Sequence, residues 1–328
     1  MFLIFALSVG SYIAVFCPIS TGISPDDSTH YPNSLNTSQL VNPESSLGER
    51  VFSDPLNDGV KYKKSFNLSI TESDQNTREK GDNLLNYLDV QDITRATSYS
   101  TPGNIVLTQY SLSYTPSAIG LWIARLFHLP LTIQVIFGRL FNLSFYVLVV
   151  FLALRLVPVK KTLFAAISLI ATMIFLAANY SYDSFLYAML LLGLTMTLRL
   201  RYSNDESIRT SQVLAILIIF TIGFSPKAIY VLLLGVMFIV PKCKFASKSD
   251  YAKYISSIFV FGFFSLATFV LPFFITGGSN VSDLRGGNEV NAFCQLCYVL
   301  QAPLSYFSIL GNSLIEWLNI NNQSIYMT

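Results

Sequence analysis

Residues 132–156 of the chain read TIQVIFGRLFNLSFYVLVVFLALRL. The stretch is almost entirely apolar, and its charged residues are Arg139 near the start and Arg155 near the end. A helix that crosses a bilayer needs about 20 predominantly apolar residues. The stretch therefore predicts a transmembrane helix and indicates an all-α membrane protein.

The composition of the whole chain agrees with this class. Of its 328 residues, 52% are hydrophobic and only 12% are charged, and the mean hydropathy is +0.51. A soluble globular protein carries about 25% charged residues. These values predict a polytopic membrane protein, which has the lipid bilayer as a binding partner. The net charge of +2 does not favour nucleic acid as a partner.

Apolar runs on both sides of the first stretch predict further helices. Residues 1–19 lack the basic start and the small-residue cleavage site of a signal peptide, so we expect a retained first transmembrane helix. An interfacial helix is expected at 116–129, because this run is short and interrupted by charge. Together with 132–156, the expected spans are 162–179, 184–198, 212–241 and 254–275.

Two of the apolar runs leave alternatives open. Ser225-Pro226-Lys227 interrupts the run at 212–241, which indicates two short helices or one kinked helix. The bundle over 116–275 then holds about six helices. The run at 292–318 is ambiguous.

Lys and Arg cluster in three of the short turns. The turns at 155–161, 199–209 and 242–253 carry three, three and four of them. Because positively charged short loops stay in the cytoplasm, we expect these turns and the N-terminus inside. The loop at 20–115 and the segment at 276–328 are then outside. At roughly ninety residues the loop is long for a structureless connection, so we expect part of it to be folded.

Two adjacent carboxylates and a histidine follow the first helix. Residues 22–31 read GISPDDSTHY and contain Asp26, Asp27 and His30. A carboxylate here can act as a general base or hold a divalent cation. Repulsion between the two carboxylates raises the pKa of one of them. Alternatively, the stretch is a turn that caps a following helix, since Asp and Ser are favoured there.

Four further polar groups fall on the predicted outer side. The turn at 180–183 ends in Asp183, which can instead serve as the N-cap of the next helix. Lys227 interrupts an apolar run, where a charge is costly and usually functional. Arg139 can snorkel or bind an anion, and Arg285 lies on an outer loop. Together these cations suit a lipid-linked phosphate.

Cys294 and Cys297 have the C-x-x-C spacing of redox and zinc sites. No second C-x-x-C or neighbouring histidine in the sequence completes a metal site. We therefore interpret them as two ordinary thiols or a local disulfide.

Six short motifs follow one another in an order that resembles the DUF2142 family of bacterial membrane proteins. The resemblance covers nearly the whole chain. The motifs are PDDSTH at 25–30, YTPSAIG at 114–120, GRLFN at 138–142, SYDS at 181–184, PKAIY at 226–230 and DLRGG at 283–287.

The resemblance implies a layout similar to that of the GT-C glycosyltransferases. Those enzymes use polyprenyl-phosphate sugars and carry an acidic residue just after the first helix. By motif, Asp26 matches the aspartate of the family, Asp27 stands where the family has glutamate, and His30 matches its histidine. Family members continue through further spans, so the resemblance implies that a chain ending at Thr328 is shortened.

The resulting hypothesis is a multi-pass protein of the bacterial cytoplasmic membrane. It transfers a sugar from a polyprenyl-phosphate donor to an envelope glycan or glycolipid on the outer face. Asp26 is the expected base or metal ligand, supported by Asp27 and His30. The residues expected to bind the donor are Arg139, Asp183, Lys227 and Arg285. The alternative is a non-enzymatic transporter or scaffold for envelope polysaccharide assembly; a transporter is expected to carry internal repeats, and none is evident.

Overall fold

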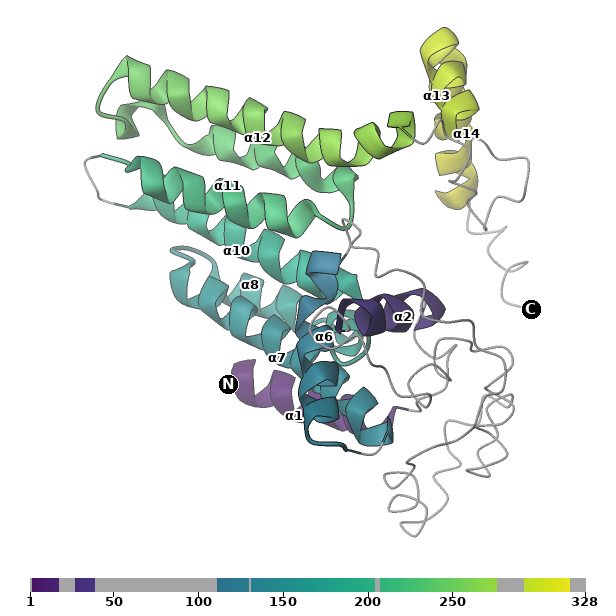
Figure 1. Cartoon of the computed structure of the whole chain (residues 1–328). Helices are drawn as coiled ribbons and strands as arrows, with labels where there is room; N and C mark the ends of the chain where they lie inside the picture. Colours follow the sequence, from purple (N-terminus) through teal and green to yellow (C-terminus); the bar gives the residue numbers. More distant parts are fainter. Residues whose placement is uncertain are drawn as a thin grey trace. The chain divides into compact units, whose positions relative to one another are not determined.

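The computed structural model describes residues 2–17, 27–38, 111–129, 131–203, 207–275 and 292–318. Every regular element in these ranges is a helix, and none of these residues forms a strand (Figure 1). The predicted all-α class is therefore confirmed.

Three of the described helices are long and apolar enough to cross a membrane. They are α7 (Leu131–Leu156), α10 (Tyr182–Tyr202) and α12 (Lys248–Ile275). The sequence located α7 to within one residue, because its apolar run is continuous. Helix α12 begins at Lys248, six residues before the predicted start at 254, because Ser247 caps its first turn.

Ser247 stabilises the first turn of α12. Its Oγ accepts a hydrogen bond from the backbone N–H of Asp250 at 3.1 Å and donates one to Asp250 Oδ2 at 2.8 Å. These contacts satisfy a backbone donor that has no partner within the helix. The helix therefore extends into the basic turn that the sequence placed before it.

The interrupted run at 212–241 forms two short helices, as one of the two interpretations predicted. Helix α11 covers Thr210–Phe224, and the 3₁₀-helix η1 covers Ala228–Ile239. Lys227 lies between them in an extended conformation. A second 3₁₀ turn, η2 (Lys242–Lys244), precedes α12.

The prediction of a single helix over 162–179 is wrong, because the structure has two short helices in this range. These are α8 (Lys161–Ser168) and α9 (Ala171–Ala177). Ile170 between them has an extended backbone with ψ of 132°. The carbonyl of Ser168 accepts a hydrogen bond from Tyr146 Oη of α7 at 2.8 Å, so a tertiary contact occupies the end of α8.

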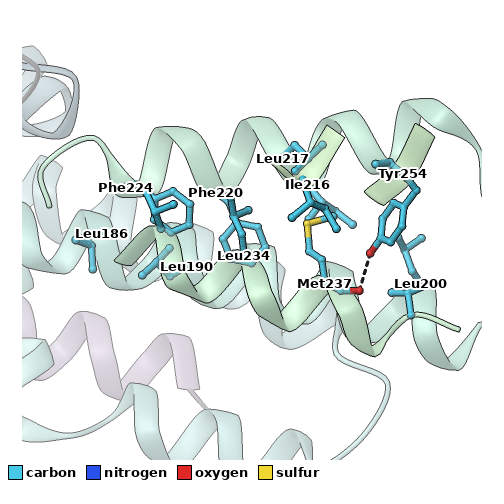
Figure 2. Close-up of a cluster of buried hydrophobic side chains, with 14 residues drawn as sticks. Leu186, Leu190, Leu200, Ile216, Leu217, Phe220, Phe224, Leu234, Met237 and Tyr254 are labelled. Carbon is cyan, nitrogen blue, oxygen red and sulfur yellow. Dashed lines mark hydrogen bonds between the residues drawn. The ribbon is translucent and has the colours of Figure 1, made fainter. Parts of the chain in front are cut away.

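Helix α10 lies between two groups of helices within residues 1–265, which form one compact unit. Leu186, Leu190 and Leu200 belong to a buried cluster with α11, η1 and the start of α12 (Figure 2). Ala188 and Leu191 belong to a second cluster with α7, α9 and α1 (Phe2–Phe16). In the apolar window of α10, 61% of the residues are buried, against 17% in α12. Helix α10 is thus the central helix of the unit.

Helices α2 (Asp27–Ser38) and α6 (Ser111–Leu126) pack together, and α6 also packs on α7. Helix α2 lies inside the loop predicted at 20–115, so part of that loop is folded as expected. Helix α6 starts before residue 116 and contains Pro116. Gly120 lets α6 approach α7 closely, because a Cβ there would lie 2.5 Å from the carbonyl oxygen of Phe137.

Residues 266–328 form a second compact unit. It contains the end of α12, α13 (Ala292–Gln301) and α14 (Pro303–Leu318). The ambiguous run at 292–318 is thus a pair of helices.

Candidate functional site

One face of α2 is polar and contacts α6. His30, Ser34 and Ser38 are four residues apart, so they share that face. His30 Nδ1 lies 2.7 Å from Tyr114 Oη, and Ser34 Oγ lies 2.8 Å from Ser117 Oγ. All these side chains are buried. The hydrogen bonds therefore satisfy groups that water does not reach, and they fix the position of α2.

The third contact involves a buried arginine. Arg125 Nη2 of α6 donates to the carbonyl oxygen of Ser38 at 2.8 Å and to its Oγ at 2.9 Å. Arg125 is only 8% exposed. Its charge thus binds the last residue of α2, where cations interact favourably with the helix dipole. Because the partners on both helices follow in increasing order, α2 and α6 run parallel.

His30 also meets the start of α10. Its ring packs against Tyr182 at 4.8 Å between centroids with an interplanar angle of 87°, and Tyr114 lies 5.9 Å from the same tyrosine. Aromatic contacts therefore join both α2 and α6 to the start of α10. Tyr31 makes a similar edge contact with Tyr180 at 5.0 Å.

Lys227 reaches the same tyrosine from the turn between α11 and η1. Its Nζ lies 5.0 Å from the centroid of the Tyr182 ring and 2.7 Å from Asp183 Oδ1. We call the residues His30, Tyr114, Tyr182, Asp183 and Lys227 the His30 cluster. It joins four segments of the chain that lie far apart in the sequence.

The ion pair in the cluster is partly open to solvent. The side chains of Lys227 and Asp183 are 36% and 33% exposed. Burial alone would lower the pKa of Lys227, but the hydrogen bond and the charge of Asp183 outweigh this and raise it above the usual lysine value. Lys227 is therefore a cation at any physiological pH, and about a third of its side chain is open to solvent.

The start of α10 is held by its own cap and by α7. Ser181 is the N-cap, and its Oγ accepts from the backbone N–H of Asp183 at 3.1 Å. The sequence interpretation that made Asp183 the N-cap is therefore wrong by two positions. The Nδ2 of Asn142, buried on α7, donates to the carbonyl of Asn179 at 2.8 Å and to Ser184 Oγ at 3.1 Å. The turn that presents Asp183 is thus fixed from two sides.

Arg139 lies near the end of α1. It is 2% exposed, and its Nη1 donates to the carbonyl oxygens of Cys17 at 2.7 Å and Ala14 at 3.4 Å. The carbonyls at the end of a helix have no partner within it, and a cation there is favourable. Arg139 therefore fixes the point from which the chain leaves α1 toward residue 26.

The geometry above can be set against known proteins. The family model described as "Predicted membrane protein (DUF2142)" matches residues 7–320. The chain belongs to the DUF2142 family. The comparisons with curated proteins and with solved structures returned no match.

The structure of this DUF2142 protein brings together three of the seven residues that the sequence singled out. His30, Asp183 and Lys227 share the His30 cluster, whereas Arg139 lies at the end of α1. Asp26 and Arg285 fall outside the described residues. Asp27 is the first residue of α2, one turn before His30, but its side chain is also outside the described part.

The metal and cysteine interpretations stay predictions. In the part of the chain that the structure describes, no group of three or more His, Cys, Asp and Glu side chains could hold a metal ion. Asp26 lies outside that part. Cys294 and Cys297 both lie on α13, and Cys297 is a half-buried free thiol, which favours the ordinary thiol over the local disulfide; the side chain of Cys294 is not among the described ones.

Sequence reasoning missed several residues that build the site of this DUF2142 protein. Tyr114 and Tyr182 line His30, Arg125 fixes the end of α2, and Asn142 fixes the start of α10. Tyr114, Tyr182 and Asn142 each lie within one of the family motifs quoted above. The available signal was a polar residue inside an apolar helix and within such a motif, because membrane helices bury polar groups only where those groups have partners.

Proposed function

We propose that this DUF2142 protein is a GT-C-like glycosyltransferase of the bacterial cytoplasmic membrane. It transfers a sugar from a polyprenyl-phosphate donor to an envelope glycan or glycolipid on the outer face. The observation that carries the proposal is the His30 cluster. There, the partly exposed cation Lys227 contacts the ring of Tyr182, and His30 of α2, the helix that begins with Asp27, packs against the same ring.

The proposed reaction needs one base and one cation. A carboxylate, Asp26 in this proposal, takes the proton of an acceptor hydroxyl as the oxygen attacks the anomeric carbon. The bond between that carbon and the donor phosphate breaks, and polyprenyl phosphate leaves with the bonding electrons. Lys227 stabilises the charge that develops on the leaving phosphate. Asp27 and His30 orient the base.

The remaining residues have supporting roles in the proposal. Asp183 orients the ammonium of Lys227 through the 2.7 Å ion pair. Arg285 is the proposed second cation for the donor phosphate. Arg139 holds the end of α1, the helix that precedes Asp26 in the sequence, and a direct contact with the donor stays a prediction. A divalent cation on Asp26 and Asp27 is the alternative way to neutralise the phosphate.

The proposed orientation puts the His30 cluster outside. Asp183 lies in the first turn of α10, whereas Arg199 and Arg201 lie in its last turn. If the basic end is cytoplasmic, the N-terminus is inside and the loop at 20–115 faces outward. The proposed division of the chain is a first helix at 1–19, this outer loop, a membrane bundle at 116–275 and an outer segment at 276–328.

The test is complementation of a deletion strain, read by analysis of its surface glycans. Asp26→Asn and Asp27→Asn, expressed at the normal level, should each fail to restore the glycan that the deletion removes. Asp250→Asn is the matched control, because Asp250 is a carboxylate at the start of α12, away from the proposed base. It should restore the glycan fully.

The rival function is a non-enzymatic transporter or scaffold for envelope polysaccharide. It needs the fold but no base. If Asp26→Asn and Asp27→Asn both restore the glycan, the catalytic proposal is wrong and the scaffold is favoured.

A further inference from the structure

The three basic turns gather at one end of the unit formed by residues 1–265. Helices α7 and α10 run in the same direction, since Phe145 stacks on Phe185 at 4.9 Å and Val135, near the start of α7, accepts from Tyr180 Oη. Their C-terminal ends, with Arg155 on α7, therefore lie on the same side.

The other two turns are joined by hydrogen bonds. The backbone N–H of Ile208 donates to the carbonyl of Lys244 at 3.0 Å, and Lys244 Nζ donates to the carbonyl of Ser203. The turn after α10 is thus fixed to the turn before α12. We call this surface the basic end; its cations are Arg155, Lys160, Lys161, Arg199, Arg201, Arg209, Lys242, Lys244, Lys248 and Lys253.

The basic end has a large excess of positive charge. The three turns carry ten Lys and Arg residues, against the carboxylates of Asp205, Glu206 and Asp250. All ten cations except Lys244 are exposed. Among the described residues of these turns, Asp250 is the acidic one; it forms an ion pair with Lys253 of its own helix and accepts a hydrogen bond from Ser247, which precedes that helix. Most of the cations therefore have no carboxylate to neutralise them within these turns.

Apolar and aromatic surface borders the cations. The guanidinium of Arg155 lies 5.0 Å from the ring centroid of Phe151, and Leu152 beside it is exposed. Lys242 Nζ lies 5.9 Å from the ring of Tyr251. Tyr202, at the end of α10, is exposed. Cations and tyrosines at the ends of apolar helices are typical of the depth at which lipid head groups lie.

We propose that the basic end binds the phosphates of anionic phospholipids in the leaflet that surrounds it. The joined turns bring several guanidinium and ammonium groups to one end of the unit, and these groups are suited to binding phosphate oxygens. The exposed apolar side chains just beyond, such as Leu152, contact the acyl chains. A protein ligand is not favoured, because exposed apolar side chains such as Leu152 lie next to the cations at these helix ends.

The experiment is native mass spectrometry of the purified full-length protein, titrated with phosphatidylglycerol or with phosphatidylcholine of the same acyl chains. We expect phosphatidylglycerol to bind at least about tenfold more tightly, because each Lys or Arg near an anionic surface adds a severalfold gain. A variant with Arg199, Arg201, Lys242 and Lys248 all changed to Gln should lose this preference.

Two controls make the result specific. The matched variant carries Lys61→Gln, Lys63→Gln, Lys64→Gln and Lys80→Gln, which removes the same charge elsewhere in the chain. It should keep the preference for phosphatidylglycerol. Raising the salt concentration to about 1 M should weaken the preference of the unaltered protein, because the screening length falls to about 3 Å.

Three outcomes would overturn the proposal. They are equal binding of the two lipids, a preference that survives in the basic-end variant, and a preference lost equally in both variants. The salt titration needs no substitution, so a variant that fails to fold still leaves the proposal open to refutation.

Discussion

Gly138 lies where α7 meets the turn that precedes α10. A Cβ at this position would lie 2.2 Å from the hydroxyl oxygen of Tyr180 and 2.8 Å from its Cζ. Tyr180 is 2% exposed, donates to the carbonyl of Val135 at 2.9 Å and packs edge-on against Tyr31 of α2. Gly138→Ala therefore forces Tyr180 out of a position that supports both α2 and the start of α10.

The expected cost follows from two effects. Overpacking a well-filled interior costs about 1–3 kcal/mol. Losing the hydrogen bond of a buried hydroxyl costs a further 1–3 kcal/mol or so. We therefore predict that Gly138→Ala lowers the free energy of unfolding by about 2–6 kcal/mol.

The assay is equilibrium unfolding of the purified protein in mixed detergent micelles. Gly235→Ala on η1 is the matched control, since a Cβ there meets nothing within 4 Å, and it should leave the stability within about 0.5 kcal/mol of the unaltered protein. Adding Tyr180→Phe to Gly138→Ala should recover part of the loss, because it removes the nearest clashing atom. Equal stability of the two glycine variants would refute the reasoning.

Three further predictions follow from the polar contacts. Arg125→Met should destabilise the protein by about 1–3 kcal/mol in the same unfolding assay, because the buried carbonyl of Ser38 loses its donor; unchanged stability would show that α2 does not depend on this contact. Folding raises the pKa of Lys227 above the usual lysine value of about 10.4. The ion pair with Asp183 therefore stabilises the folded protein fully below about pH 10.4, and this stabilisation is lost as the pH rises through the raised pKa of Lys227 in the folded protein. The destabilisation caused by Asp183→Asn, at most about 1 kcal/mol for so exposed a pair, should therefore be constant from pH 7 to 9 and shrink only above about pH 10.4; a change near neutral pH would contradict this. Finally, a variant that keeps only the exposed Cys243 should react with a membrane-impermeant maleimide after permeabilisation and not in intact cells; labelling of intact cells would reverse the proposed orientation.

The sequence predicted well those parts of the fold that depend on local patterns. The continuous apolar run of α7 and the Pro226 break before η1 were both recognisable, because length and proline geometry act within one segment. The break at Ile170 was not, since the local sequence contains no glycine or proline there and a contact from Tyr146 meets the end of α8. Such tertiary contacts leave no mark in the periodicity.

The candidate site was predicted only in part, because local patterns reveal some of its residues and not the tertiary contacts between them. Charged residues in or beside apolar helices are conspicuous, and this selected Asp183 and Lys227, which do pair. The hydrogen bond between His30 and Tyr114 joins residues 84 positions apart, and nothing local indicates it. Arg139 was selected for its charge, but a single charge does not reveal that it donates to the carbonyls at the end of α1.

The most direct test of the proposed site is the binding of polyprenyl phosphate, the product that leaves the donor whatever sugar it carries. Titration of the purified protein should give a Kd at least about tenfold lower for polyprenyl phosphate than for the uncharged polyprenol, since a charge-assisted contact contributes about 1.5–3 kcal/mol. Lys227→Met should abolish that difference, and Lys227→Arg should keep part of it. Equal binding of the phosphate and the alcohol, or a preference that survives Lys227→Met, would contradict the assignment of the His30 cluster as the donor site.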